Sequence, residues 1–533
     1  MRKKSKVLGL NEPLRHQDHS PPRTRREFVS QGFRLGTATV LVPSIFSLFV
    51  DPKKAHAALS SDIDALRQAC GITTGAGKIP FICFDLAGGG NIAGSNVLVG
   101  GRGGQLDFLT IAGYNKLGLP GTMVPSPSAT GNFIDSTFGL RFHSDSAHLR
   151  GMKTRTRAMA MTNTSGAVIP ALSQNDTSIN PHNPMYGIYK AGANGALLGL
   201  IGSQSSISGG NSMAPATMID VTAQPTKVSR SSDVTGLVNT GSLATLLPDP
   251  NDVTAVMESV VRISNLKLPQ VQAFVDPVAD KAAKSIDTCS YTKAAYLTDT
   301  YNSPAALNPD VDPDIVGAGG IFTPAEYAGN ADFRKTAAVM KMVIDGNAGA
   351  GTIEMGGFDY HTGDRATGET RDFNLGSCIG ACLEYAARRG KPLMIYVFSD
   401  GSLASSGMID NSVAGRGKGV WTADNQDVAS TYFLVFNPKG KPQLMPDNPE
   451  NHMQIGFFNA DGSVNTTGSA AANSVTNLVQ TVVLNYLALH GEQAKFSTLY
   501  PSPNLNNTLG DATAQAALIA FQPLAGIVGG KIT

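Results

Sequence analysis

Apolar runs and helical repeats alternate regularly between residues 330 and 438. Apolar residues recur at helical spacing in two segments, which predicts helices over 332–345 and 373–389. Short apolar runs between and after them predict buried strands over 351–355, 393–398 and 431–436. Gly390 follows the second helical segment and is typical of a helix C-terminus. This rhythm of helix and strand predicts an α/β protein, with a mostly parallel sheet in a three-layer α/β/α arrangement.

The remainder of the chain adds four elements to this prediction. The apolar run 79–86 contains Asp85 and leads into three consecutive glycines, which predicts a buried strand followed by a tight glycine loop. Residues 202–216 are rich in Ser and Gly and predict an exposed loop. A helix is expected over 252–266 with Asp252 as its N-cap, and an amphipathic helix over 475–490, closed by Gly491.

The N-terminus has the order of a cleavable export signal. A twin-arginine box contains Arg25 and Arg26, an apolar stretch covers 37–50, and a small-residue site ends at Ala57. The apolar stretch is shorter than the ~20 residues that span a bilayer, and Pro43 interrupts it. We therefore expect a signal peptide over 1–57 and one α/β domain with long loops over 58–533. The twin-arginine translocase would deliver the folded protein to the periplasm or beyond, with no stable membrane span after cleavage.

Charge and cysteine content narrow the class of protein. The chain has 42 basic and 41 acidic residues. Its first 57 residues contain 11 of the basic and 4 of the acidic residues. Residues 58–533 therefore have 31 basic and 37 acidic residues, a net charge of −6. A mildly acidic mature protein is a poor nucleic-acid binder. Five cysteines match no zinc-ribbon spacing, and Cys378 and Cys382 are expected to be core thiols. The sequence leaves any disulfide pairing open.

Candidate metal ligands follow the predicted strands. Asp85, Asp359, His361 and Asp400 all fall at or just after a strand, and the carboxyl ends of parallel strands share one edge of a sheet. Carboxylate and imidazole together suit zinc or a similar divalent ion. Asp424, before the next strand, would add another ligand. The structural alternatives are a helix-capping role for Asp359 and an Asx-turn for Asp400.

The other motifs in the sequence are interpreted as structural or are excluded as functional sites. His182 lies between two prolines, where a surface loop histidine is the default interpretation. The segment 142–148 (FHSDSAH) is interpreted as a turn leading into a short helix. An EF-hand starting at Asp310 is excluded, because Ile315 and Ile321 occupy the positions that need Gly and Glu. The sequence contains no G-x-S-x-G elbow, P-loop or H-E-x-x-H helix, which argues against esterases of the α/β-hydrolase type, NTPases and zincins.

In order, these motifs resemble a family of twin-arginine-exported bacterial proteins in the alkaline phosphatase and sulfatase superfamily. The family pattern is R-R-x-F, then L-x-G-G, a histidine, D-T-H, S-E-F-G-R, D-H-G and a C-terminal helix. The corresponding segments here are Arg25-Arg26-Glu27-Phe28, Leu86-Ala87-Gly88-Gly89, Pro181-His182-Asn183, Asp359-Tyr360-His361, Ser399-Asp400-Gly401, Ala423-Asp424-Asn425 and 478–490. The resemblance covers nearly the whole chain.

The resemblance implies a metal-dependent hydrolase of phosphate or sulfate esters that uses zinc, manganese or calcium. Asp359, His361 and Asp400 would be its first metal ligands, followed by His182 and Asp424. Asn91 stands where the family has a Ser or Asp and cannot act as a nucleophile, so Ser95 is the candidate. Asn425 replaces the histidine of D-H-G, which weakens one metal site. The alternative is a catalytically degenerate protein that acts in binding or assembly at the cell surface or in the periplasm.

Replacing Arg25 and Arg26 with lysine should retain the protein in the cytoplasm, because the translocase recognises the arginine pair. Cell fractionation and immunoblotting measure the distribution. A double-lysine variant that still reaches the periplasm would contradict the export signal.

Overall fold

The structure is a computed structural model, and it describes residues 59–70, 72, 75–126, 132–173, 180–238, 246–247, 249–272, 274–301, 304–501 and 508–533. Arg25, Arg26 and Ala57 of the predicted signal lie outside these residues. The chain divides into two compact units. A helical unit comes from residues up to 71 and from 241–300, and a sheet unit comes from 72–240 and 301–533.

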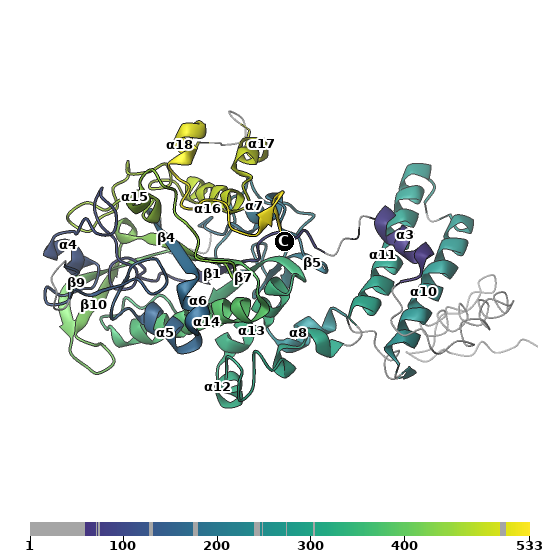
Figure 1. Ribbon diagram of the computed structural model, residues 1–533, viewed down its shortest axis with the longest axis horizontal. Helices are drawn as coiled ribbons and strands as arrows, with labels where there is room; N and C mark the ends of the chain where they lie inside the picture. Colours follow the sequence, from purple (N-terminus) through teal and green to yellow (C-terminus); the bar gives the residue numbers. More distant parts are fainter. Residues whose placement is uncertain are drawn as a thin grey trace, which may run out of the picture. The chain divides into compact units, whose positions relative to one another are not determined.

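The sheet unit contains seven strands in the order β4-β11-β8-β1-β7-β5-β6 (Figure 1). All neighbouring strands pair in parallel except β11, which is antiparallel to both β8 and β4. The predicted mostly parallel α/β sheet is therefore confirmed. The strands are β1 Phe81–Leu86, β4 Thr164–Pro170, β5 Leu198–Gly202, β6 Thr226–Lys227, β7 Ala348–Met355, β8 Leu393–Ser399 and β11 Ser430–Phe436.

Helices cover both faces of this sheet, which gives the three layers (Figure 1). On one face, α7 (Met185–Lys190) and α16 (Val475–Leu489) share a core with alternate residues of β1, β8 and β11. On the other face, α13 (Ala331–Ile344) contacts β7 and β1, and α14 (Ala366–Arg389) contacts β8 and β11. Nearly all of α16 is buried, so it is a core helix rather than the predicted amphipathic one.

Smaller elements fill the connections. A β-hairpin, β9 Leu403–Asp410 and β10 Lys418–Asp424, follows β8. The remaining helices of the sheet unit are α4 Ile111–Lys116, α5 Ala147–Arg155, α6 Ala158–Thr162, α8 Ser231–Gly236, α12 Pro324–Gly329, α15 Pro449–Met453, α17 Phe496–Leu499 and α18 Ala512–Ala516. Short pairs are formed by β2 Ile134–Asp135 with β3 Phe142–His143 and by β12 Ile527–Val528 with β13 Lys531–Ile532.

One predicted segment differs in detail and another is confirmed. The loop 202–216 lacks helix and strand beyond Gly202, as expected, but it is only partly exposed, and Ser208 and Ser212 are buried. The turn and short helix predicted around 142–148 are confirmed, because Ser146 caps α5. Cys378 and Cys382 are buried free thiols, as predicted.

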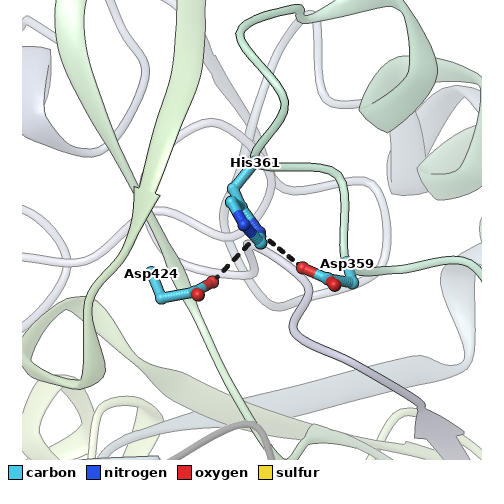
Figure 2. A group of neighbouring side chains, drawn as sticks. All are labelled: Asp359, His361 and Asp424. Carbon is cyan, nitrogen blue, oxygen red and sulfur yellow. Dashed lines mark ion pairs between the residues drawn. The ribbon is translucent and has the colours of Figure 1, made fainter.

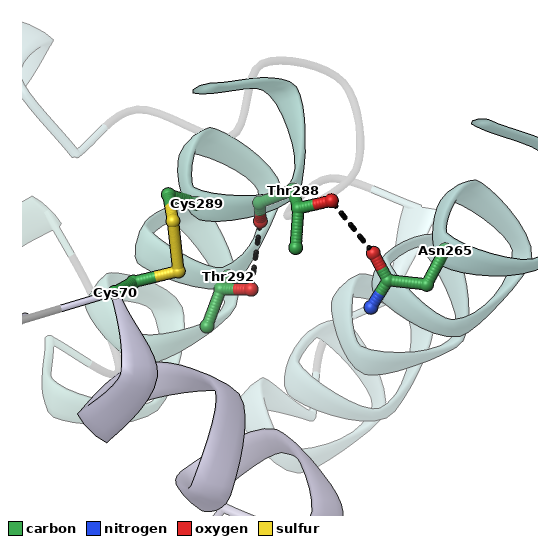
Figure 3. Close-up of a disulfide and its surroundings, with 5 residues drawn as sticks. All are labelled: Cys70, Asn265, Thr288, Cys289 and Thr292. Carbon is green, nitrogen blue, oxygen red and sulfur yellow. Dashed lines mark hydrogen bonds between the residues drawn. A yellow bond between two sulfur atoms is a disulfide. The ribbon is translucent and has the colours of Figure 1, made fainter. Parts of the chain in front are cut away.

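The helical unit consists of α3 (Ser61–Ala69), α10 (Pro250–Lys267) and α11 (Pro277–Thr300). Its small core contains Ile63, Val261 and Ala295. A disulfide joins Cys70, after α3, to Cys289 in α11 (Figure 3). The prediction of one domain over 58–533 did not anticipate this separate unit. Its α10 begins earlier than predicted, because Asp249 rather than Asp252 is the N-cap and Pro250 starts the helix.

No helix in the described part of the chain combines the length and apolar character that crossing a membrane requires.

Glycines allow α5 and α14 to pack closely. A Cβ atom added at Gly376 of α14 would lie 2.2 Å from the backbone oxygen of His148 in α5. Gly376→Ala should therefore lower the free energy of unfolding by about 1–3 kcal/mol through overpacking. Urea denaturation measures this change. Gly329→Ala, at the end of α12, is the control, because nothing lies within 4 Å of its added Cβ. Equal effects of the two substitutions would contradict the close packing.

Candidate metal site at the carboxyl edge of the sheet

The loop after β7 presents Asp359 and His361 to solvent. Phe358 and Tyr360 are buried, while the side chains of Asp359 and His361 retain 50% and 35% exposure. The Tyr360 hydroxyl donates to Asp372 Oδ1 at 3.0 Å and accepts from the Asn91 backbone N–H at 3.1 Å. Because successive residues of an extended segment point to opposite sides, burial of the two aromatic rings directs the acid and the imidazole outward.

The same loop is tied to β10, which contributes the third residue. The Gly363 amide donates to the Trp421 carbonyl at 3.0 Å, and the Trp421 amide donates to the Asp364 carbonyl at 3.2 Å. Asp424, the last residue of β10, pairs in the hairpin with Leu403 of β9. These contacts bring Asp424 and the D-x-H loop to one place on the surface.

Figure 2 shows the His361 ring between the two carboxylates. His361 Nδ1 lies 3.3 Å from Asp424 Oδ1 and also contacts the Asp359 carboxylate. One potential ligand atom from each of the three residues lies within 4.8 Å of the others. Among the residues that the structure describes, this is the one group of at least three His, Cys, Asp or Glu side chains that lie close enough together to hold a metal ion.

The donor set fits a borderline transition-metal ion. Two carboxylate oxygens and one imidazole nitrogen are suitable ligands for Zn²⁺ or Mn²⁺. Calcium sites are built from oxygen ligands, so the imidazole argues against calcium. With three protein ligands at an exposed position, such a site would leave coordination positions open to solvent or substrate.

Asp400 contacts the glycine loop that packs against Asp359. Its side chain is buried, and Oδ1 accepts from the Gly88 amide at 3.0 Å. Gly88 has φ +108°, and a Cβ there would lie 2.8 Å from the Asp359 Cβ. Asp400 therefore lies at the predicted edge of the sheet and holds the glycine loop against Asp359. It does not join the group of three candidate ligands.

His182 and Ser95 are also buried. His182 Nε2 lies 3.1 Å from the Ser173 carbonyl oxygen, and its ring stacks on Phe398. Burial lowers the pKa of His182 to about 4, so the ring is neutral. Ser95 Oγ donates to Asn91 Oδ1 at 3.1 Å, and both residues are almost completely buried. Neither His182 nor Ser95 belongs to the exposed group.

Sequence reasoning missed a buried polar network that fixes Tyr360. Asp372, in α14, accepts from Tyr360 and from Asn96 Nδ2, the latter at 2.7 Å. His148 Nε2 lies 3.6 Å from Asp372 Oδ1, and His148 Nδ1 lies 3.2 Å from the Tyr432 hydroxyl. Burial keeps the pKa of Tyr360 and of Tyr432 well above the ordinary value, so both remain hydrogen-bond donors. His148, the second histidine of the segment F-H-S-D-S-A-H, was the only sequence signal for this network.

A second buried network supports β10. Glu369 Oε1 accepts from Lys418 Nζ at 2.8 Å and from Arg365 at 2.9 Å, and all three side chains are buried. Burial opposes ionisation of Glu369, but the charges of Arg365 and Lys418 hold its pKa below the ordinary value. The Arg365 guanidinium also lies over the Trp421 ring, 4.5 Å from its centroid. Removal of one partner would leave a buried charge uncompensated.

Comparison of the chain with known protein family models, with curated proteins and with solved structures finds no match. The assignment of the candidate metal site is therefore based on the geometry of Asp359, His361 and Asp424 alone.

Asp85, the other predicted ligand, anchors a loop instead. Its Oδ2 accepts from the backbone N–H groups of Asn211 and Ser212 at 2.8 and 2.7 Å, and Oδ1 accepts from Ser212 Oγ at 2.8 Å. Burial, together with a smaller contribution from the nearby charge of Asp400, raises the pKa of Asp85 to about 7 despite these donors.

This raised pKa predicts a pH dependence of stability. An unfolded aspartate has a pKa of about 3.9, so between about pH 4 and 7 the folded protein binds a proton at Asp85 that the unfolded chain lacks. Stability contributed by Asp85 should therefore fall as the pH rises through this window and level off above pH 7. From pH 5 to 7 the loss should be on the order of 2–3 kcal/mol.

Urea denaturation of wild type and Asp85→Asn at pH 5, 6, 7 and 8 measures this effect. An asparagine can accept from the two backbone amides and donate to Ser212 Oγ, so the variant keeps the contacts without the charge. As the pH rises, the unfolding free energy of wild type should fall relative to that of Asp85→Asn, because only wild type loses the stability that protonated Asp85 contributes. Parallel pH profiles for the two proteins would refute the raised pKa.

Proposed function

We propose that this protein binds one divalent metal ion at Asp359, His361 and Asp424 and hydrolyses phosphate or sulfate esters outside the cytoplasm. The observation that carries the proposal is the convergence of two carboxylates and one imidazole at an exposed edge of a mostly parallel sheet. Ligands of α/β sheets bind at this carboxyl edge. A divalent ion there would polarise an ester oxygen and lower the pKa of bound water.

The residues around the ligands have positioning roles in this proposal. Asp359 and His361 are held outward by buried Tyr360, and Asp424 is held by the hairpin. Asp400 keeps the Gly88 amide in place beside Asp359. Glycine at position 88 lets the backbone of the glycine loop approach Asp359 closely, because a Cβ there would lie 2.8 Å from the Asp359 Cβ.

Water is the attacking group in this mechanism. Ser95 is buried and hydrogen-bonded to Asn91, which leaves it no access to a substrate on the surface. The oxygen of water would bond to phosphorus or sulfur, the bond to the ester oxygen would break, and the alcohol would leave with a proton. This differs from the serine, threonine or modified cysteine attack that the family resemblance implies.

The proposed location outside the cytoplasm draws on two features. The sequence has a twin-arginine box followed by an apolar stretch and a small-residue cleavage site. The helical unit contains the Cys70–Cys289 disulfide, a bond that persists in oxidising compartments and is rare in the cytoplasm.

A second candidate is a metal-binding protein without catalytic activity that acts in binding or assembly at the cell surface or in the periplasm. The burial of Ser95 and the amide residues Asn91 and Asn425 favour it, because none of them supplies a nucleophile. Asn425 instead accepts from the Asp427 amide at 2.9 Å and caps a short helix. Metal binding is common to both candidates, and hydrolysis distinguishes them.

Metal titration of the mature protein tests the site. Wild type should bind about one equivalent of Zn²⁺ or Mn²⁺, and His361→Ala or Asp424→Ala should weaken binding at least tenfold, because each removes one of three ligands. Equilibrium dialysis with elemental analysis measures this affinity. Asp427→Ala is the matched control, since this exposed acid lies three residues beyond Asp424 and outside the group.

Hydrolysis of p-nitrophenyl phosphate and p-nitrophenyl sulfate by the metal-loaded protein then separates the candidates. Activity that disappears in His361→Ala and persists in Asp427→Ala supports the hydrolase. Stoichiometric metal without turnover of either ester supports the binding protein. Metal binding that is equal in wild type and His361→Ala would eliminate the site itself.

A further inference from the structure

The helical unit combines two segments that lie far apart in the sequence. One segment contributes α3, and the other contributes α10 and α11. The Cys70–Cys289 disulfide connects the end of α3 to the middle of α11 (Figure 3). Because only residues 268–276 separate α10 from α11, these two helices form a local hairpin. The helix that has to be held in place from elsewhere in the chain is therefore α3.

The α10–α11 hairpin has contacts of its own that do not involve the disulfide. Figure 3 shows that the Thr288 hydroxyl in α11 donates to Asn265 Oδ1 in α10, at 3.0 Å. Val261 of α10 and Ala295 of α11 are both completely buried in the small core of the unit. We therefore expect the hairpin to persist when the disulfide is reduced.

By contrast, α3 is too short to be a stable helix by itself. It has nine residues, and isolated helices shorter than about 12 residues are marginal in water. Ile63 is its one buried residue. Asp62, in its first turn, accepts from Arg262 of α10 at 2.7 and 2.8 Å, but the Asp62 side chain is 55% exposed. Such exposed ion pairs contribute little to stability, so α3 depends strongly on the disulfide at its other end.

The environments of the five cysteines confine redox chemistry to this unit. Cys70 and Cys289 are both partly exposed, whereas the free thiols of Cys83, Cys378 and Cys382 are completely buried. Burial raises the pKa of Cys378 to about 12 and also raises the pKa of the other two thiols. These three thiols therefore stay protonated and do not take part in disulfide exchange.

We propose that the helical unit is a redox-dependent element, in which α3 is docked on the α10–α11 hairpin while Cys70 and Cys289 are joined and separates from it when both are thiols. A dithiol reductant opens the bond in two steps. Its first thiolate attacks one protein sulfur, and the other cysteine leaves as a thiolate and takes up a proton. Its second thiolate then displaces the remaining cysteine and closes the reductant's own disulfide. A disulfide oxidant reverses both steps.

This redox dependence gives the folding of the chain an order. Disulfides are rare in the cytoplasm and persist in oxidising compartments. For a chain that is exported in the folded state, the sheet unit is complete before export, and α3 docks after it. This order rests on the proposed location outside the cytoplasm. The redox dependence itself is a property of the purified protein and is tested without reference to export.

Hydrogen exchange of the full mature protein, followed by mass spectrometry before and after treatment with dithiothreitol, tests this proposal. Amides of residues 61–70 should exchange at least tenfold faster after reduction, whereas those of β1 and α16 should be unchanged. Iodoacetamide should then label Cys70 and Cys289 and leave the three buried cysteines unlabelled. Reoxidation with glutathione disulfide should restore slow exchange over 61–70.

Two variants separate the disulfide from the other contacts of α3. The double variant Cys70→Ser, Cys289→Ser should exchange over 61–70 as fast without reductant as reduced wild type does. Asp62→Asn removes the exposed ion pair with Arg262 and keeps the disulfide, so it is the matched control and should stay within threefold of oxidised wild type. The proposal is overturned if reduction or the double substitution accelerates exchange over 61–70 less than tenfold, if β1 or α16 loses protection as well, or if Asp62→Asn has the same effect as reduction.

Discussion

Complete burial of β1 is the constraint on which the architecture depends. All six of its residues are buried, so its backbone hydrogen bonds must be satisfied by parallel pairing with β7 on one side and β8 on the other. The register places Leu86 opposite both Met355 and Ser399. The three strands therefore end at one level, and the loops that follow them converge. The contacts of Gly88 with Asp359 and Asp400 are a direct result.

The sequence pattern predicted the elements better than it predicted the environment of their side chains. Strands β1, β7 and β8 and helix α13 lie where apolar spacing placed them, because local periodicity reflects which positions are buried. The antiparallel direction of β11 depends on the route of the chain through the hairpin β9–β10, which no local pattern encodes. The helical unit also escaped prediction, since α3 and α11 are far apart in the sequence.

The candidate site illustrates the same limit. Asp85, Asp359 and Asp400 all lie at strand ends in the sequence, and all reach the same edge of the sheet. Asp85 and Asp400 are covered by neighbouring loops and accept backbone hydrogen bonds, whereas Asp359 lies outside that cover. Tertiary packing decides which carboxylate meets solvent. The sequence therefore named the three members of the group, but it could not separate them from Asp400 and His182, which lie outside it.

Pairing of a carboxylate with an imidazole has three different consequences in this molecule. The pairs are Asp359–His361, His148–Asp372 and Asp447–His452. The first is exposed and open to a metal ion, the second is enclosed and rigidifies the loop that carries the first, and the third joins a buried ring to an exposed carboxylate. The chemistry of the residues is the same in each case, and burial determines the role.

The disulfide of the helical unit has a topological consequence. Because Cys70 precedes β1 and Cys289 follows β6, the bond closes a covalent ring that contains β1 to β6 and α10. A single peptide-bond cleavage at any position between these cysteines opens the ring without separating the pieces. Under oxidising conditions the nicked protein would remain one molecule, and reduction would release two fragments. A protein built in this way resists fragmentation by proteases between two cysteines that are 219 residues apart in the sequence.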